Sequence, residues 1–329
     1  MSFRALVTRK TDDDQFASAV ETLDDSQLPE GDVTVDVDWA GLNYKDGLCL
    51  TNPAAMSKVF PHVAGIDFAG VVRDSNDARY QAGQKVVLTG WRVGETHWGG
   101  YSQRARVNAD WLVPLPDGLS TRDAMVVGTA GLTAMLAINR LEAAGLMPEQ
   151  GEVLVTGAAG GVGSIAVAVL AKLGYAVAAL SGRPQHAEAL KDLGASKIVD
   201  RTEFLAEADK PLEAARWAGA IDNVGGKLLA KVLSQVKYDG VVASIGMAGG
   251  VDLPATVMPF ILRGVTLIGI DSVMRPMPQR LAAWQRIAES FDIAAYGGLV
   301  EEIPLEDLPA AAQKILAGEV NGRIIVNTN

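Results

Sequence analysis

The sequence predicts an α/β protein with a β-rich N-terminal domain and a second domain that contains a doubly wound parallel sheet. Two observations support this fold class. The chain has 329 residues, which is too long for one ordinary core. The sequence pattern changes along the chain, from short β-rich runs in the first third to alternating strands and helices from Glu152 onward. We therefore expect one domain at residues 1–122 with 295–329 and another at residues 123–294.

The N-terminal part is expected to form an all-β or partly open barrel. Its β-rich runs lie at residues 4–10, 33–42, 68–74 and 85–91 and are broken by Gly, Pro, Asn and Asp.

A long helical stretch is expected to follow these strands. Ser120 and Asp123 have the spacing of a capping box, and the Ala- and Leu-rich segment after them is interrupted near Gly128 and ends before Pro148.

From Glu152 short apolar runs alternate with helical segments. The expected strands are residues 153–157, 175–182, 197–201, 220–224, 240–246 and 265–271. Nearly continuous apolar strands separated by helices are typical of a parallel sheet covered on both faces. Helices at residues 279–291 and 308–316 precede a last strand at 323–326, which we expect to return to the N-terminal domain.

Composition excludes several classes of function. The chain has 39 acidic and 29 basic residues, a net charge of −10, and no basic stripe, so nucleic-acid binding is not expected. The first residues do not resemble a cleavable leader, and no uncharged apolar run approaches roughly 18–20 residues, so we expect a cytoplasmic protein without a membrane partner. Cys49 is the only cysteine, and we expect it to pack as a small apolar residue rather than act as a nucleophile.

A phosphate-binding turn is indicated directly after the strand at 153–157. The chain reads Ala158-Ala159-Gly160-Gly161-Val162-Gly163 there and continues into an apolar helix. Glycines let a pyrophosphate approach the backbone, and a helix N-terminus offers unpaired N–H groups. The alternative is a glycine-rich turn that binds nothing.

The end of the next strand indicates which dinucleotide is bound. NAD enzymes usually carry Asp or Glu there to hold the ribose 2′-hydroxyl. This chain has Ser181-Gly182-Arg183, and Arg201 follows at the end of the next strand. A hydroxyl and guanidinium groups can hydrogen-bond a 2′-phosphate, so we expect NADPH. The alternative is that both arginines are solvated surface residues.

Three stretches of the sequence resemble the medium-chain dehydrogenase/reductase superfamily, and the resemblance covers the whole chain. Gly41-Leu42-Asn43-Tyr44-Lys45-Asp46 is similar to the N-Y-K-D loop of the quinone oxidoreductase-like branch, and residues 61–72, PHVAGIDFAGVV, are similar to the glycine-rich segment of the superfamily. The AAGGVG run is similar to its cofactor turn. The resemblance implies a GroES-like β-rich catalytic domain and a Rossmann cofactor-binding domain.

The chain departs from the zinc-containing members of this superfamily. These carry His-Glu after the corresponding glycine, where Ile66 and Asp67 stand here, and a four-cysteine lobe is impossible with one cysteine. His62 and His97 show no ligand spacing, so we expect no metal.

Within the superfamily, the motifs together with Asp200-Arg201 and Asn321-Gly322-Arg323 are most similar to the acrylyl-CoA reductase group. The resemblance implies NADPH-dependent reduction of acryloyl-CoA to propanoyl-CoA by a homodimer. It also implies the residues around the cofactor, which are Tyr44, Ala159, Gly160, Gly161, Val162, Ser181, Gly182, Arg183, Arg201, Met247, Ile261, Ser272 and Asn321.

A conjugated thioester suits a site without zinc, because its double bond is already activated. Hydride would reach the β-carbon while the thioester oxygen gathers enolate charge and the α-carbon gains a proton. Tyr44 is the catalytic candidate beside the nicotinamide, and the alternative is a tyrosine that only packs. We expect Asn43 and Asp46 to shape the turn and Asp67 to orient a water molecule.

Two other functions stay open at this point. An NADPH:quinone oxidoreductase would use the same fold and cofactor, and a non-catalytic NADPH-binding protein would need only the cofactor site. An acyl-CoA substrate requires basic groups for its phosphates, and the candidates are Lys45, Lys58, Arg92, Arg104 and Arg275.

Overall fold

The computed structural model describes residues 1–13, 15–206 and 210–329, which form two compact units. The first unit contains residues 1–129, 272–288 and 297–329, and the second contains residues 130–271 and 289–296. The domain limits that we expect from the sequence stay a prediction about which parts fold independently.

The first unit is built on two sheets. One has the order β2-β1-β4, and the other has the order β15-β16-β3-β5-β6-β8 with β7 paired to β3. Its strands are β1 (Ser2–Lys10), β2 (Phe16–Asp24), β3 (Val33–Leu42), β4 (His62–Val63), β5 (Asp67–Ser75), β6 (Lys85–Thr89), β7 (Arg104–Val107), β8 (Leu112–Pro114), β15 (Val300–Pro304) and β16 (Arg323–Asn327). Buried aliphatic side chains such as Leu6, Val35 and Leu88 form its core.

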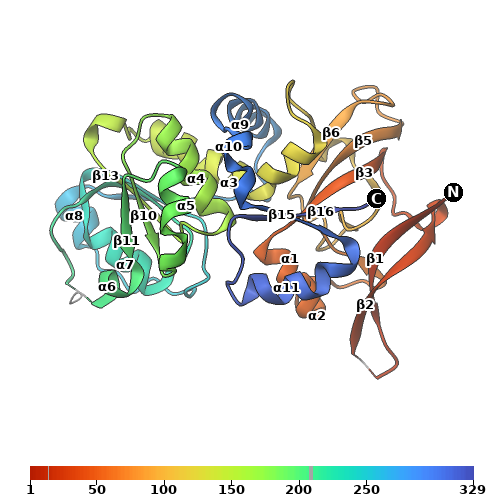
Figure 1. Cartoon of the computed structure of the whole chain (residues 1–329), viewed down its shortest axis with the longest axis horizontal. Helices are drawn as coiled ribbons and strands as arrows, with labels where there is room; N and C mark the ends of the chain where they lie inside the picture. The colour runs from red at the N-terminus through yellow and green to blue at the C-terminus, as the bar shows by residue number, and fades with distance from the viewer. Residues whose placement is uncertain (14, 207–209) are drawn as a thin grey trace. The chain divides into compact units, whose positions relative to one another are not determined.

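The C-terminal strand returns to the N-terminal sheet, which confirms the prediction. β16 runs antiparallel to β3 and places Ile324 opposite Leu42 and Val326 opposite Ala40 (Figure 1). β15 then extends the sheet as a parallel neighbour of β16. The pairing brings Arg323, at the start of β16, next to the end of β3.

The helices of the first unit include α1 (Tyr44–Thr51), α2 (Pro53–Met56) and α11 (Leu308–Leu316). Helix α9 (Met277–Ser290) lies mostly in this unit.

Helix α3 (Thr121–Ala143) begins with the predicted cap, because Ser120 Oγ accepts from Asp123 N at 3.1 Å. It is interrupted at Gly128, where φ is 51° and ψ is −156°, as the sequence indicates. This helix is long and apolar enough to cross a membrane, but 83% of the apolar window is buried inside the protein, as in the core helix of a globular fold.

The second unit contains a six-stranded sheet in which every pair of neighbours is parallel. Its order is β11-β10-β9-β12-β13-β14, which is that of a doubly wound nucleotide-binding fold. The strands are β9 (Val153–Thr156), β10 (Val177–Ser181), β11 (Lys197–Asp200), β12 (Trp217–Asp222), β13 (Val236–Ser244) and β14 (Thr266–Gly269). The helices are α4 (Gly161–Lys172), α5 (Ala187–Asp192), α6 (Arg201–Ala206), α7 (Gly226–Ser234), α8 (Met258–Arg263) and α10 (Ile293–Tyr296) (Figure 1). Because the strands are parallel, all their carboxyl ends meet at one edge.

Candidate functional site

The glycine-rich turn connects β9 to the first turn of α4. Gly160 is the N-cap of α4, and its N–H donates to Gly157 O at 3.0 Å. A Cβ on Gly163 would lie 2.4 Å from Gly157 O and 2.7 Å from Ala158 Cα, so only glycine allows the helix to approach the turn this closely. The turn has the shape and the free helix N-terminus that a pyrophosphate requires.

A buried carboxylate that the sequence analysis missed supports this turn. Asp222 ends β12 and accepts from Thr156 Oγ1 at 2.7 Å and from Gly225 N at 2.7 Å. Asn223 adds a hydrogen bond from its side-chain amide to Thr156 O at 2.7 Å. Burial raises the pKa of Asp222. The signal in the sequence is a polar residue at the carboxyl end of two apolar strands, at Thr156 and Asp222.

The residues of the predicted phosphate clamp lie at the carboxyl ends of β10 and β11, which are neighbouring strands. Ser181 Oγ accepts from Arg183 N at 3.1 Å, and Ala158 N donates to Leu180 O at 3.1 Å, which joins this region to the glycine-rich turn. The Arg201 guanidinium lies so close to Gly182 that a Cβ there would be 2.6 Å from Cζ. Burial and the nearby charge of Arg201 lower the pKa of Arg183. Two guanidinium groups thus lie near the carboxyl edge of the sheet, and their binding of a phosphate stays a prediction.

The remaining predicted cofactor residues lie in different parts of the chain. Met247 follows β13 and is 69% exposed, and Ile261 is on α8 and is 73% exposed. Ser272 and Asn321 belong to the first unit, as does Tyr44. Ser272 O accepts from the buried Arg280 guanidinium at 2.8 Å, which fixes the backbone there. Their contact with a cofactor stays a prediction.

Tyr44 is the first residue of helix α1, and its side chain is 48% exposed. Asp46 Oδ2 accepts from the backbone N–H of Asn43 at 2.9 Å and from its side-chain amide at 3.1 Å, as expected for residues that shape the turn. Among the residues that the structure describes, the Tyr44 hydroxyl makes no hydrogen bond. Hydrogen bonds therefore hold the start of the helix, and the exposed Tyr44 hydroxyl can donate to a ligand.

A buried polar network surrounds the base of this helix. Asp67 Oδ1 accepts from Gly41 N at 3.1 Å and from the Asn43 side chain at 3.0 Å, and Asp67 Oδ2 accepts from Thr129 N at 2.6 Å. Arg323 donates to Asn43 Oδ1 at 3.0 Å. The oxygens of Asp67 therefore hold three segments of the protein together, and its expected contact with a water molecule stays a prediction.

The charges of this network are close enough to affect one another. Asp46 is fully buried, and Asp46 Oδ1 accepts from Ile66 N at 2.9 Å. Burial and the charge of Asp67 raise the pKa of Asp46. The packing also explains why glycine stands at the break in α3, because a Cβ on Gly128 would lie 2.6 Å from Arg323 Nη2.

The residues at the position of the zinc ligands of related enzymes, Ile66 and Asp67, do not fit a metal ion. The Ile66 side chain has no atom that can bind a metal, and the Asp67 carboxylate already accepts hydrogen bonds from Gly41 N and Thr129 N. Across residues 1–13, 15–206 and 210–329, no group of three or more His, Cys, Asp or Glu side chains could hold one. Cys49 is buried, which raises the pKa of its thiol and agrees with the predicted packing role.

Comparisons with known proteins agree with this architecture. Residues 29–117 match the family described as alcohol dehydrogenase GroES-like domain, and residues 161–289 match the family described as zinc-binding dehydrogenase. The second match spans helix α4 and the residues of the predicted phosphate clamp, although the described residues contain no cluster of zinc ligands.

Three relatives are similar over nearly the full chain. Acrylyl-CoA reductase AcuI of Ruegeria pomeroyi is 56% identical over 328 residues, 99% of each chain. The yhdH oxidoreductase of Salmonella enterica, solved in complex with NADP, is 53% identical over 100% of both chains with a TM-score of 0.95. The putative quinone oxidoreductase YhfP of Bacillus subtilis is 46% identical over 325 residues, 98% of each chain. Its structure with NAD bound has a TM-score of 0.95 over 99% of both chains.

Proposed function

The chain belongs to the acrylyl-CoA reductase group of the medium-chain dehydrogenase/reductase superfamily, and from this premise we propose that it reduces acryloyl-CoA to propanoyl-CoA with NADPH. The observation that carries the cofactor assignment is the pair of guanidinium groups, Arg183 and Arg201, at the ends of neighbouring strands. Their mutual repulsion is relieved by an anion that both can bind, as a 2′-phosphate would be.

The second unit supplies the cofactor site in this proposal. The turn at Ala159 to Val162 holds the pyrophosphate, and Ser181, Arg183 and Arg201 hold the 2′-phosphate. When bound, NADPH supplies the hydride that adds to the β-carbon of the substrate.

The first unit supplies the group that stabilises charge on the substrate. As the β-carbon is reduced, negative charge develops on the thioester oxygen, and a hydrogen-bond donor fixed in advance lowers the barrier. The Tyr44 hydroxyl is that donor, because the Asn43–Asp46 bonds fix the start of its helix and its ring is half exposed. The α-carbon then takes a proton, either from Tyr44 or through water.

The protein is proposed to act as a homodimer in the cytoplasm. The support for a dimer is the edge strand β14, which pairs with β13 alone among the strands that the structure describes. Beside it, α8 and the residue before it expose apolar side chains: Val257 is 64%, Met258 38% and Leu262 50% exposed. An edge strand beside exposed apolar side chains favours pairing with another copy. Sedimentation of the wild type and of Leu262→Glu tests this, and a monomeric wild type contradicts it.

The decisive experiment offers the enzyme several acceptors in parallel. NADPH oxidation is followed with acryloyl-CoA, crotonyl-CoA and a simple quinone, with NADH as the control cofactor. Rapid oxidation with acryloyl-CoA supports the proposal. A preference for the quinone would favour a quinone oxidoreductase, and tight NADPH binding without turnover of any acceptor would indicate a non-catalytic protein.

A further inference from the structure

A tight turn after β6 holds two bulky residues in the left-handed backbone region. Trp91 has a φ of 56° and Arg92 a φ of 59°. Val93 N donates to Gly90 O at 3.1 Å, so Trp91 and Arg92 occupy both central positions of the turn. Positive φ at both positions defines a type I′ turn, in which Gly, Asn and Asp predominate. Trp and Arg are strained in this conformation.

The surrounding structure holds the strained turn in place. The Arg280 guanidinium is fully buried, lies 4.7 Å from the centroid of the Trp91 ring, and donates to Thr89 O at 2.8 Å and Val273 O at 2.7 Å. Trp91 N donates to the same Val273 O at 2.9 Å. The hydrogen bonds and the ring contact of the buried Arg280 guanidinium hold Trp91 and Arg92 in a backbone conformation that these residues otherwise disfavour. Backbone strain maintained in this way is typical of functional positions.

The turn leaves the Arg92 side chain exposed at a fixed point. The Arg92 carbonyl accepts from Glu95 N at 3.1 Å and from Thr96 N at 2.9 Å, which ties the backbone after Arg92 to the following turn. Its guanidinium forms no ion pair with any residue in the described ranges. The neighbouring Lys45, at the start of α1, is instead paired with Glu95 at 3.2 Å.

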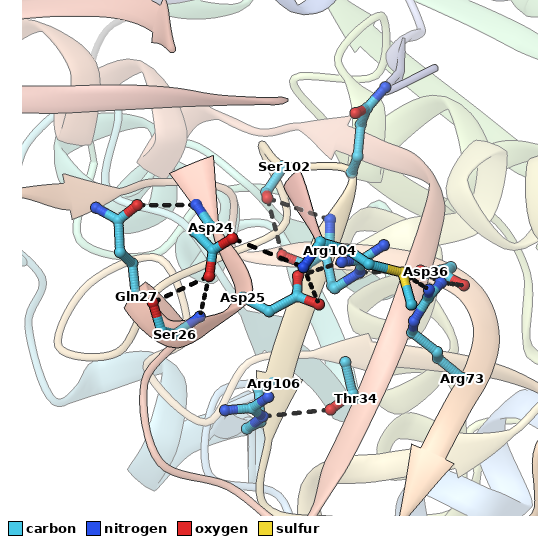
Figure 2. Close-up of polar contacts among 12 residues, drawn as sticks. Asp24, Asp25, Ser26, Gln27, Thr34, Asp36, Arg73, Ser102, Arg104 and Arg106 are labelled. Atoms are coloured by element: carbon cyan, nitrogen blue, oxygen red, sulfur yellow. Dashed lines mark hydrogen bonds and ion pairs between the residues drawn. The ribbon is translucent and has the colours of Figure 1, made fainter. Parts of the chain in front are cut away.

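The other basic candidates for phosphate binding differ from Arg92. Arg104 is buried between Asp25 and Asp36 and donates to both, as Figure 2 shows. Arg275 hydrogen-bonds Gln279 at 3.4 Å. Lys58 is exposed, but its backbone is outside the left-handed region. Among these five candidates, only Arg92 combines an exposed side chain with a strained, left-handed backbone conformation.

We propose that Arg92 binds a phosphate of the coenzyme A part of the substrate and so selects CoA thioesters over acceptors without phosphate. The inference rests on the proposed function. The chain has a net charge of −10, which repels a substrate that carries several phosphates, so a local cation is needed for binding. A guanidinium binds phosphate through two parallel hydrogen bonds, which suits this role better than an ammonium group.

Two substrates and two substitutions test the inference. Acryloyl-CoA is compared with acryloyl-pantetheine, which has the same thioester and no phosphate. Arg92→Gly and Arg92→Asn remove the guanidinium and place residues that tolerate the left-handed region, so both variants should fold. Lys85→Gln is the matched control, because it removes one exposed positive charge at the opposite end of β6.

We expect both Arg92 variants to raise the KM for acryloyl-CoA roughly tenfold, a change of about 1.4 kcal/mol. Their kcat, their KM for NADPH and their KM for acryloyl-pantetheine should match the wild type, and their Tm should be unchanged or higher because the strain is relieved. An unchanged KM for acryloyl-CoA, or an equal rise in KM for both thioesters, overturns the role of Arg92 but leaves the proposed function intact. A wild type that reduces neither thioester overturns the proposed function and the inference with it.

Discussion

A single methyl group added at Gly182 should weaken the binding of NADPH much more than the binding of NADH. A Cβ there would lie 2.6 Å from Cζ and Nε of Arg201 and 2.7 Å from Nη2. Gly182 is outside the left-handed region, so alanine fits the backbone without strain. Because the atoms in the way belong to the flexible end of a side chain, Gly182→Ala should move the Arg201 guanidinium and leave the strand in place.

The size of the effect follows from the bond that is lost. A hydrogen bond to a charged group contributes about 1.5–3 kcal/mol net. Arg201 is exposed, so solvent screening places the loss near the lower end. The KM for NADPH should therefore rise roughly tenfold, since each tenfold step is about 1.4 kcal/mol. The KM for NADH should stay nearly constant, because NADH has a hydroxyl group in place of the phosphate.

Steady-state kinetics with both cofactors, on a double-mutant cycle, gives the measurement. Gly182→Ala, Arg201→Ala and the double variant are compared, and the methyl group should add nothing once the guanidinium is absent. Gly298→Ala is the control, because a Cβ there meets nothing within 4 Å. Equal losses with NADPH and NADH, or fully additive effects in the double variant, would refute the reasoning.

Three further predictions concern the turn and the catalytic unit. Tyr44→Phe should lower kcat with acryloyl-CoA roughly a hundredfold at unchanged stability, because the lost hydroxyl stabilises the enolate; a kcat equal to that of the wild type would leave Tyr44 as a packing residue. Gly163→Ala should weaken binding of NADPH and NADH alike and lower the free energy of unfolding by about 1–3 kcal/mol, since its Cβ meets backbone atoms; cofactor titration and urea unfolding check this, and unaltered affinity would contradict it. Burial and the charge of Asp67 raise the pKa of Asp46 to about 7, so between about pH 4 and about pH 7 the folded state binds more protons than the unfolded chain. Wild-type stability should therefore fall as pH rises through this range and level off above it. Urea unfolding from pH 5 to 8 should show this slope reduced in Asp46→Asn, and an identical slope would exclude Asp46 as its source.

Most secondary-structure elements could be predicted because their signals are local. The alternation of apolar strands and helices after Glu152 matches the six-stranded sheet, and the break at Gly128 and the cap at Ser120 lie where the sequence indicates. Some boundaries moved: β12 begins at Trp217 rather than at residue 220. Strands β2, β4, β7, β8 and β15 are not among the expected ones. The long strand β2 escapes prediction because most of its residues are exposed or half-buried and it is held chiefly by pairing with β1.

The sequence by itself determined the glycine-rich turn, the Ser181-Gly182-Arg183 run and the missing metal ligands, because each depends on the identity of residues within a short window. Only the tertiary structure decided which polar groups meet across long stretches of chain. Asp222 supports Thr156 from a neighbouring strand, and Arg323 reaches Asn43 because β16 pairs with β3. These partners are set by strand order and packing, and no local pattern of hydrophobicity or turn residues specifies them.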